Sequence, residues 1–196
     1  MKKGILAPIS AILIATLVLG GASFGLKGVA QKNYEAKRLW LMQTILPESE
    51  VFTEEAYAGE DTNIRSVHKA ENGYVVETVV YGYAGEITML VGVSNAGRVT
   101  GMVVTDLSET YGLGANALTD HVFLAQFLNG EGNFSIETGS DAWSGATQSA
   151  SATDGAGVDA ISGATVTSKA IVKSINSAVA FVTGADIESA ATSWGG

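Results

Sequence analysis

The sequence predicts an α+β domain that follows one N-terminal transmembrane helix. Three observations support this fold class: an uncharged apolar run near the N-terminus, three consecutive segments rich in β-branched residues, and an amphipathic helical pattern near the C-terminus. The 196 residues suffice for one ordinary domain. We therefore expect a transmembrane anchor at 1–30, a juxtamembrane helix and linker at 31–60, a single domain at 61–185 and a flexible tail at 186–196.

The apolar run extends from Gly4 to Leu26 and contains no charged residue. A helix needs about 20 apolar residues to cross a bilayer, so this run predicts a single transmembrane helix. A cleaved signal peptide is the alternative, because "GGASFG" weakly resembles a cleavage site. Lysine and arginine flank both ends, and the positive-inside rule therefore leaves the orientation open. The usual behaviour of a first helix favours a cytoplasmic N-terminus.

Helix-forming residues continue from Gln31 to Leu46, and Pro47 is expected to stop this juxtamembrane helix. Its apolar residues recur at helical spacing, at Leu39, Met42 and Ile45 or Leu46. The acidic, turn-rich stretch "PESEVFTEEAYAGEDTN" comes next and is expected to be a linker.

Three strands are expected after the linker. They are "GYVVETVVYGY" from Gly73, "EITMLVGV" from Glu86 and "RVTGMVVT" from Arg98, all rich in Val, Ile, Thr and Tyr. Glycine-containing turns such as Asn95–Gly97 separate them. This arrangement predicts an antiparallel meander.

Two helices are expected to pack on this sheet. The first, "ALTDHVFLAQFLNG", should end at Asn129 and Gly130. The second should begin beside residue 165 and end at Gly184, because apolar residues recur there at helical spacing, at Ile171, Ile175, Ala178, Val179 and Val182. The segment 133–157 is so rich in Gly, Ser and Ala that it is expected to add little to the core.

Composition excludes several functions. The net charge of −9 and the pI near 4.6 disfavour binding to nucleic acid or to anionic lipid. Without cysteine the chain has no disulfide, Fe–S cluster or thiolate metal site. His68 and His121 lack metal-ligand spacing and are expected to be ordinary surface or core residues. No catalytic acid, base or nucleophile forms a recognisable constellation, so we expect neither catalytic residues nor a metal.

Two similar heptapeptides are present, "DAWSGAT" ending at Thr147 and "DAISGAT" ending at Thr165. Only Thr165 stands at the entrance of the predicted C-terminal helix, where unpaired backbone N–H groups and the helix dipole favour a phosphate. Gly163 and Ala164 add little bulk beside it. Thr147 is followed by "QSASATDGAG", which has no helical periodicity. From spacing alone, a turn with a helix cap remains the alternative for either copy.

The stretch "DAISGATVTSKAIVKSIN" closely resembles the covalent flavin-attachment signature of FMN-binding domains. These domains occur in the G subunit of the Rnf complex and in the C subunit of the sodium-translocating NADH:quinone reductase. The resemblance implies that FMN is attached to Thr165 through a phosphoester bond, by a separate flavin transferase that uses FAD. By position, Ser162, Gly163 and Ala164 would form the attachment turn, and Asp159 would be part of what the transferase recognises.

The resemblance extends upstream. The predicted meander looks like the family's sheet, and "SETYGLG" at Ser108–Gly114 looks like the Glu-Thr-Pro-Gly-Leu-Gly loop that lies against the flavin. Tyr111 replaces the usual Pro, and Leu107 stands where many members have His, which leaves open the rigidity of the loop and a polar role at the His position. The retained loop residues, implied to lie beside the flavin, are Glu109, Thr110, Gly112, Leu113 and Gly114.

The resemblance implies an electron-carrying subunit of an ion-translocating ferredoxin:NAD oxidoreductase, with its FMN domain outside the cytoplasm and its anchor in membrane lipid. Other membrane subunits of the Rnf complex would be its partners, and sodium ions or protons would be pumped. The short chain favours the Rnf complex over the quinone reductase, and NADH oxidation is expected elsewhere because no Rossmann or P-loop motif is present. A flavoprotein of another complex and a non-redox extracytoplasmic binding module remain alternatives.

Overall fold

The computed structural model describes residues 28–108, 119–137 and 157–185. These residues fall into two compact units, which meet in the chain between Trp40 and Leu41. The expected anchor, the expected loop at 109–114, the first heptapeptide and the expected tail lie outside the described residues. Among the residues that are described, no helix is both long enough and apolar enough to cross a membrane.

The first described helix covers residues 28–45, which confirms a helix in the segment before Pro47. Within the first unit its apolar side chains are exposed, including Val29, Tyr34 and Trp40. Leu39 is also partly exposed, at 39% of its surface. The remaining apolar positions expected on this helix, Met42, Ile45 and Leu46, belong to the second unit and are buried there.

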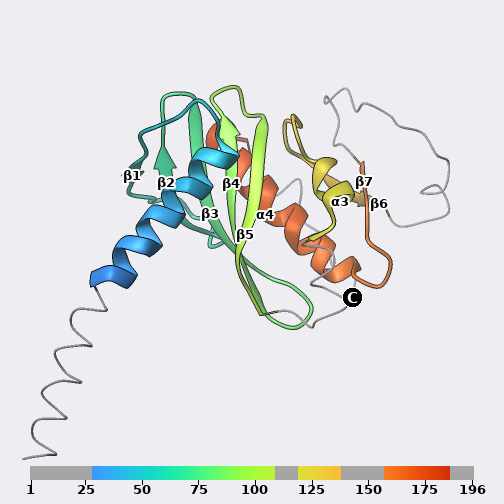
Figure 1. Ribbon diagram of the computed structural model, residues 1–196. Helices are drawn as coiled ribbons and strands as arrows, with labels where there is room; N and C mark the ends of the chain where they lie inside the picture. Colours follow the sequence, from blue (N-terminus) through green and yellow to red (C-terminus); the bar gives the residue numbers. More distant parts are fainter. Residues whose placement is uncertain (1–27, 109–118, 138–156, 186–196) are drawn as a thin grey trace, which may run out of the picture. The chain divides into compact units, whose positions relative to one another are not determined.

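The second unit is built on a five-stranded antiparallel sheet whose strands lie in the order of the chain (Figure 1). The strands are β1 (Thr53–Glu55), β2 (Ile64–Lys69), β3 (Gly73–Tyr81), β4 (Glu86–Ser94) and β5 (Val99–Leu107). The last three are the predicted meander, which is confirmed together with its antiparallel pairing. Bulges in the β4–β5 pairing, such as the one between Thr88 and Met89, interrupt the register.

The expected linker is wrong in part, because β1 lies inside it and pairs with β2. All three residues of β1 are exposed, and two of them, Glu54 and Glu55, are acidic. Such a strand joins a sheet through backbone hydrogen bonds, so its sequence shows no apolar pattern. Its charged side chains oppose pairing of this sheet edge with a strand of another molecule. The sequence does not predict β2, "IRSVHK", either, because most of its residues are polar and give no clear alternation of apolar and polar positions.

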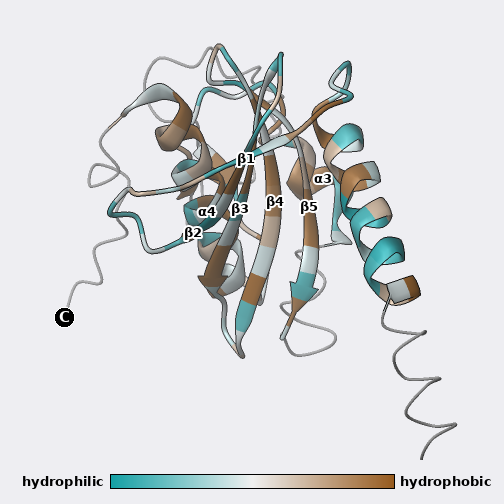
Figure 2. Cartoon of the chain, turned by 90° about the vertical axis from the view of Figure 1, so that its left-hand side faces the viewer, coloured by the Kyte–Doolittle hydropathy of each residue, from teal (hydrophilic) through white to brown (hydrophobic). Residues whose placement is uncertain are grey.

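The C-terminal helix is confirmed as α4 (Thr165–Thr183), which lies across one face of the sheet (Figure 1). It ends at Gly184 with a φ of 69°, a left-handed conformation that glycine adopts readily. Its buried face includes Ile171, Ile175 and Ala178, which pack against the valine-rich inner surface of β3 and β4. Figure 2 shows this hydrophobic content as brown segments along β3, β4 and β5.

α4 runs antiparallel to β3. Near the start of β3, the Tyr74 ring lies 5.7 Å from the Phe181 ring, edge to face. Farther along the strand, the Thr78 hydroxyl hydrogen-bonds the hydroxyl of Ser174. The first turn of α4 therefore lies toward the end of the sheet where β3 ends. β5 also ends there, because β3 and β5 are both antiparallel to β4.

The opposite face of the sheet is covered by the chain at 41–46. Met42, Ile45 and Leu46 pack there on Val75 and Leu90. The backbone comes so close that Thr100 Oγ1 donates a hydrogen bond of 2.6 Å to the carbonyl of Ile45. A sheet buried on both faces explains why β4 is buried from residue 87 to residue 93.

This close approach predicts that Gly92→Ala is destabilising. A Cβ at Gly92 would lie 2.6 Å from the Ile45 carbonyl oxygen and 2.6 Å from Thr100 Oγ1, and the first of these atoms is backbone. Because a packed backbone shifts at a cost, we expect a loss of about 1–3 kcal/mol in the free energy of unfolding, measured by urea titration. Gly28→Ala is the control, since nothing lies within 4 Å of that Cβ. Equal stability of the two variants would contradict the packing described.

The helix expected to end at Asn129 and Gly130 is shorter than predicted. α3 covers only His121–Ala125, begins after the N-cap Asp120 and gives way to turns, with Asn129 at a φ of 64°. Its anchor points are Phe123 and Phe127, which are both buried. Tertiary packing of these two rings, rather than helix length, holds the segment in place.

The described part of the segment 133–157 contributes more to the core than expected. Phe134 is 2% exposed, and its backbone N–H and C=O are both bound by the Asn176 side chain of α4, at 3.0 and 2.9 Å. β6 (Ser135–Glu137) follows directly and pairs in parallel with β7 (Gly157–Asp159). The expectation that this segment adds little to the core is therefore wrong at Phe134. The expectation was based on the composition of the whole segment, and one aromatic residue among many small ones changes that composition little.

Candidate functional site

The second heptapeptide forms a turn that leads directly into α4. The turn is closed by a hydrogen bond of 2.9 Å from the Ala164 N–H to the Ile161 carbonyl. Gly163 occupies it with a φ of 80°, which strains any residue that carries a Cβ. The glycine of the Ser-Gly-Ala-Thr group is thus required by the local backbone, whatever else the site does.

The turn is accessible and yet anchored. Asp159, Ser162 and Gly163 are exposed, and Thr165 is half-buried. Ala164, between them, is only 5% exposed and packs into the core. The structure therefore places all five sequence-predicted attachment residues at one helix entrance, where another protein can reach the Thr165 region.

The N-terminus of α4 suits a phosphate group. No side chain caps it, and its first turn contains no acidic residue. The first-turn N–H groups and the positive end of a 19-residue helix therefore face the attachment turn without competition from a carboxylate. Thr167, in the same turn, has a fully buried hydroxyl with no hydrogen-bond partner. These features fit an esterified phosphate on Thr165.

Two side chains outside the turn hold the backbone around it. Ser168, in the first turns of α4, accepts a hydrogen bond from the Ile161 N–H at 3.3 Å. Gln126, just after α3, accepts one from the Asp159 N–H at 3.0 Å. Neither residue is predicted from the sequence. The contact between Gln126 and Asp159 spans 33 residues and leaves no periodic signal, whereas a serine three residues after Thr165 is a signal that could have been noticed.

The described chain before the second predicted region ends at the same end of the sheet as the first turn of α4. β5 ends at Leu107, paired with Ile87 at the end of the sheet toward which the first turn of α4 points. The chain therefore enters the segment 109–118 from that end, with Leu107 itself 36% exposed. The retained loop residues Glu109, Thr110, Gly112, Leu113 and Gly114 are outside the described residues, and their place beside the flavin stays a prediction.

The two histidines lie on different elements. His68 is buried on β2, with 8% of its surface exposed, and His121 is exposed at the start of α3. Across the described ranges, no group of three or more His, Cys, Asp or Glu side chains is arranged to hold a metal ion.

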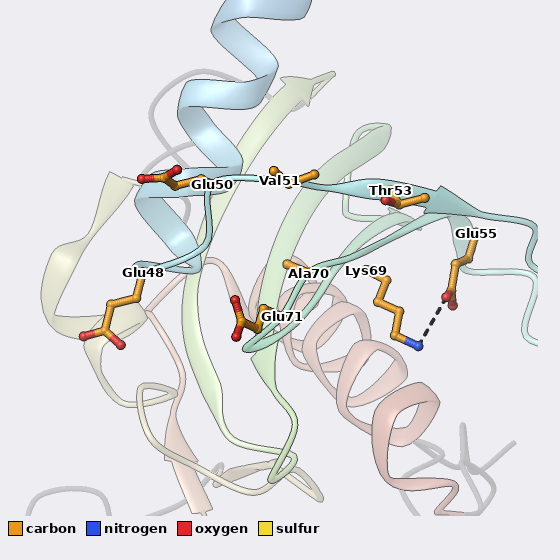
Figure 3. A pocket seen from close by; sticks show the side chains of 8 residues that line it. All are labelled: Glu48, Glu50, Val51, Thr53, Glu55, Lys69, Ala70 and Glu71. Carbon is orange, nitrogen blue, oxygen red and sulfur yellow. Dashed lines mark ion pairs between the residues drawn. The ribbon is translucent and has the colours of Figure 1, made fainter.

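A cleft of about 640 Å³ lies elsewhere in the second unit, between the segment that leads into β1 and the end of β2 (Figure 3). Its charged lining comprises Glu48, Glu50, Glu55, Glu71 and Lys69. The Lys69 ammonium lies 3.5 Å from a Glu55 carboxylate oxygen, and this carboxylate, with a smaller contribution from Tyr74, raises the pKa of Lys69. Four carboxylates against one ammonium disfavour an anionic ligand such as a flavin phosphate.

The chain is similar to subunits of known ion-translocating oxidoreductase complexes. The G subunit of the ion-translocating oxidoreductase complex of Methanosarcina acetivorans is 37% identical over 111 residues, covering 56% of this chain and 51% of that protein. The G subunit of the proton-translocating ferredoxin:NAD(+) oxidoreductase complex of Clostridium ljungdahlii is 36% identical over 110 residues, covering 56% and 53%. The chain thus spans about half the length of the curated relatives it matches.

A third relative is the G subunit of the Na(+)-translocating ferredoxin:NAD(+) oxidoreductase complex of Acetobacterium woodii. It is 34% identical over 108 residues, covering 55% of this chain and 47% of that protein. The FMN-binding domain family matches residues 82–180, about half of the chain. That range begins in the β3–β4 turn and includes β4, β5, the attachment turn and most of α4. The chain therefore belongs to the FMN-binding domain family.

Proposed function

We propose that this protein is an electron-transfer subunit of an Rnf-type membrane complex, carrying FMN esterified to Thr165. One observation carries the proposal: inside an FMN-binding domain, a turn with exposed Ser162 and Gly163 leads to a threonine at a helix N-terminus that has no side-chain cap and no first-turn acid. The acidic cleft beside β1 offers no comparable place for a phosphate. Electron transfer and the ion-translocating complex are inferred from the relatives' names.

The attachment step is a phosphoryl-group transfer to the threonine. The Thr165 hydroxyl oxygen forms a bond to the flavin-side phosphorus of FAD, the pyrophosphate bond breaks, AMP leaves, and the hydroxyl proton is released. Nothing is oxidised or reduced. A flavin transferase supplies the catalytic groups, so this chain need only present the hydroxyl and the recognised residues around it.

The roles of the chain's own residues follow from the geometry. First-turn N–H groups of α4 would hold the esterified phosphate, and Gly163, which has no side chain, would add no bulk beside it. FMN, when bound, accepts electrons and passes them on, while the protein sets its orientation and potential through contacts. The electron carrier is then fixed to a rigid helix and does not diffuse away.

The function test begins with a denaturing gel of the full chain made with its flavin transferase. Because a phosphoester survives unfolding, the protein band should fluoresce under ultraviolet light. Purification from mild detergent should then recover multi-span membrane subunits with the fluorescent band, as expected for the Rnf complex. A non-fluorescent band would favour the non-redox binding module. A fluorescent band without those subunits would favour a flavoprotein of another complex.

We also propose that Gly4–Leu26 is retained as a transmembrane anchor and that the FMN domain lies outside the cytoplasm. The uncharged apolar length of the run supports the anchor. Alkaline washing should leave the protein in the membrane fraction, and N-terminal sequencing should begin before Ala22. A mature N-terminus after Ala22 would indicate a signal peptide instead.

The placement of the FMN domain is tested with protease. Protease added to intact spheroplasts should digest the domain. A domain that is digested only after the spheroplasts are lysed would lie in the cytoplasm.

A further inference from the structure

The two heptapeptides share the letters Asp, Ser, Gly, Ala and Thr, yet they differ just beyond them. Three residues after Thr165 comes Ser168, whereas three residues after Thr147 comes Ala150. Ser168 is fully buried, and its hydroxyl oxygen accepts the Ile161 N–H. A turn followed by alanine at that position has no such acceptor. The shared letters therefore do not by themselves reproduce the turn seen before α4.

The other end of the attachment segment is held from a distant part of the chain. Asp159, the last residue of β7, donates its backbone N–H to the side-chain oxygen of Gln126. The Asp159 residue remains exposed, so its backbone is fixed while its carboxylate stays available for recognition. Gln126 itself is placed by the buried rings on either side of it, Phe123 and Phe127.

We propose that Gln126 and Ser168 are positioning residues for flavin attachment, holding the backbone from Asp159 to Thr165 in the conformation that the flavin transferase accepts. This inference rests on the proposed function. It assigns to tertiary contacts, rather than to the heptapeptide letters, the choice of Thr165 over Thr147. Neither side chain takes part in the bond-making step.

The size of the effect follows from the two hydrogen bonds. A loop that is already in the accepted conformation loses no further conformational freedom when an enzyme binds it. The net contribution of one ordinary hydrogen bond corresponds to roughly a two- to tenfold change in an equilibrium. Removing either acceptor should therefore lower the fraction of correctly arranged turn, and the attachment rate at limiting protein, by roughly two- to tenfold.

The experiment uses the full-length protein, produced without flavin, with purified flavin transferase and FAD. Initial attachment rates are measured by in-gel fluorescence over a range of protein concentrations. Gln126→Ala should raise the KM for the protein roughly two- to tenfold with little change in kcat. Gln126→Glu keeps a side-chain oxygen acceptor and should restore the KM. Ser168→Ala should raise the KM by a similar factor.

The matched control is Gln43→Ala. Gln43 also makes a side-chain hydrogen bond to backbone elsewhere in the second unit, donating to the Glu50 carbonyl seven residues away at 3.4 Å. It should leave the KM unchanged. Wild-type KM values for both Gln126→Ala and Ser168→Ala would overturn the proposal, and so would a Gln126→Glu variant as impaired as Gln126→Ala.

Failure of this inference differs from failure of the proposed function. If the positioning idea alone is wrong, the wild-type protein still acquires flavin on Thr165. If the function is wrong, the wild-type protein acquires no flavin on that residue. Thermal unfolding of each variant serves as a structural check. The Gln126 pair decides the matter even if Ser168→Ala is less stable, because Gln126 is exposed and Gln126→Glu keeps the side-chain length and the oxygen acceptor that Gln126→Ala lacks.

Discussion

Thr165→Ala is expected to abolish covalent flavin on this protein, the largest functional effect of any single substitution. Alanine lacks the hydroxyl oxygen that forms the phosphoester, although the start of α4 at residue 165 is kept. The half-buried position and the helix-forming tendency of alanine should preserve the fold. Peptide mass spectrometry should show the added FMN mass on the wild-type Thr165 peptide and none in the variant.

Thr147→Ala is the matched control, because it removes the same hydroxyl from the same letters in the first heptapeptide. It should retain full in-gel fluorescence. Thr165→Ser, which keeps a hydroxyl, should retain at least part of it. Full fluorescence in Thr165→Ala, or an FMN mass on the Thr147 peptide, would show that the helix entrance does not select the site.

Phe127→Ala is expected to be among the most destabilising substitutions in the FMN-binding domain. The Phe127 ring is fully buried and packs edge to face on Phe123 and Phe134, with ring centroids at 5.3 and 5.0 Å. Removing it leaves a cavity among side chains that cannot collapse fully, at a cost of about 3–5 kcal/mol in the free energy of unfolding. Thermal unfolding should shift by roughly 6–20 °C for a chain of this length.

The neighbouring residue provides the control. Leu128 is 44% exposed, so Leu128→Ala should change the free energy of unfolding by less than about 1 kcal/mol. Similar unfolding curves for the two variants would contradict the role of Phe127 in the core. Because Phe127 also fixes Gln126, its alanine variant should attach flavin more slowly even below its unfolding temperature.

The elements that can be located correctly from the sequence are those with a strong local pattern. β3, β4 and β5 alternate or continue in β-branched residues between glycine turns, and each of these strands forms. α4 repeats apolar residues at helical spacing up to Gly184, and it forms as well. Elements without such a pattern are missed or misjudged, namely β2, the acidic edge strand β1 and the short α3.

The sequence by itself determined the α+β class of the domain, the meander, the long helix and the position of Thr165 at the start of that helix, because periodicity and turn residues act over a few neighbouring positions. Only the tertiary structure decided how the attachment segment is held. The Gln126 bond to Asp159 and the Asn176 clamp on Phe134 join residues 33 and 42 apart. Such contacts form when packed elements bring polar atoms together. Because the partners are far apart in the chain, they produce no repeating pattern in the sequence.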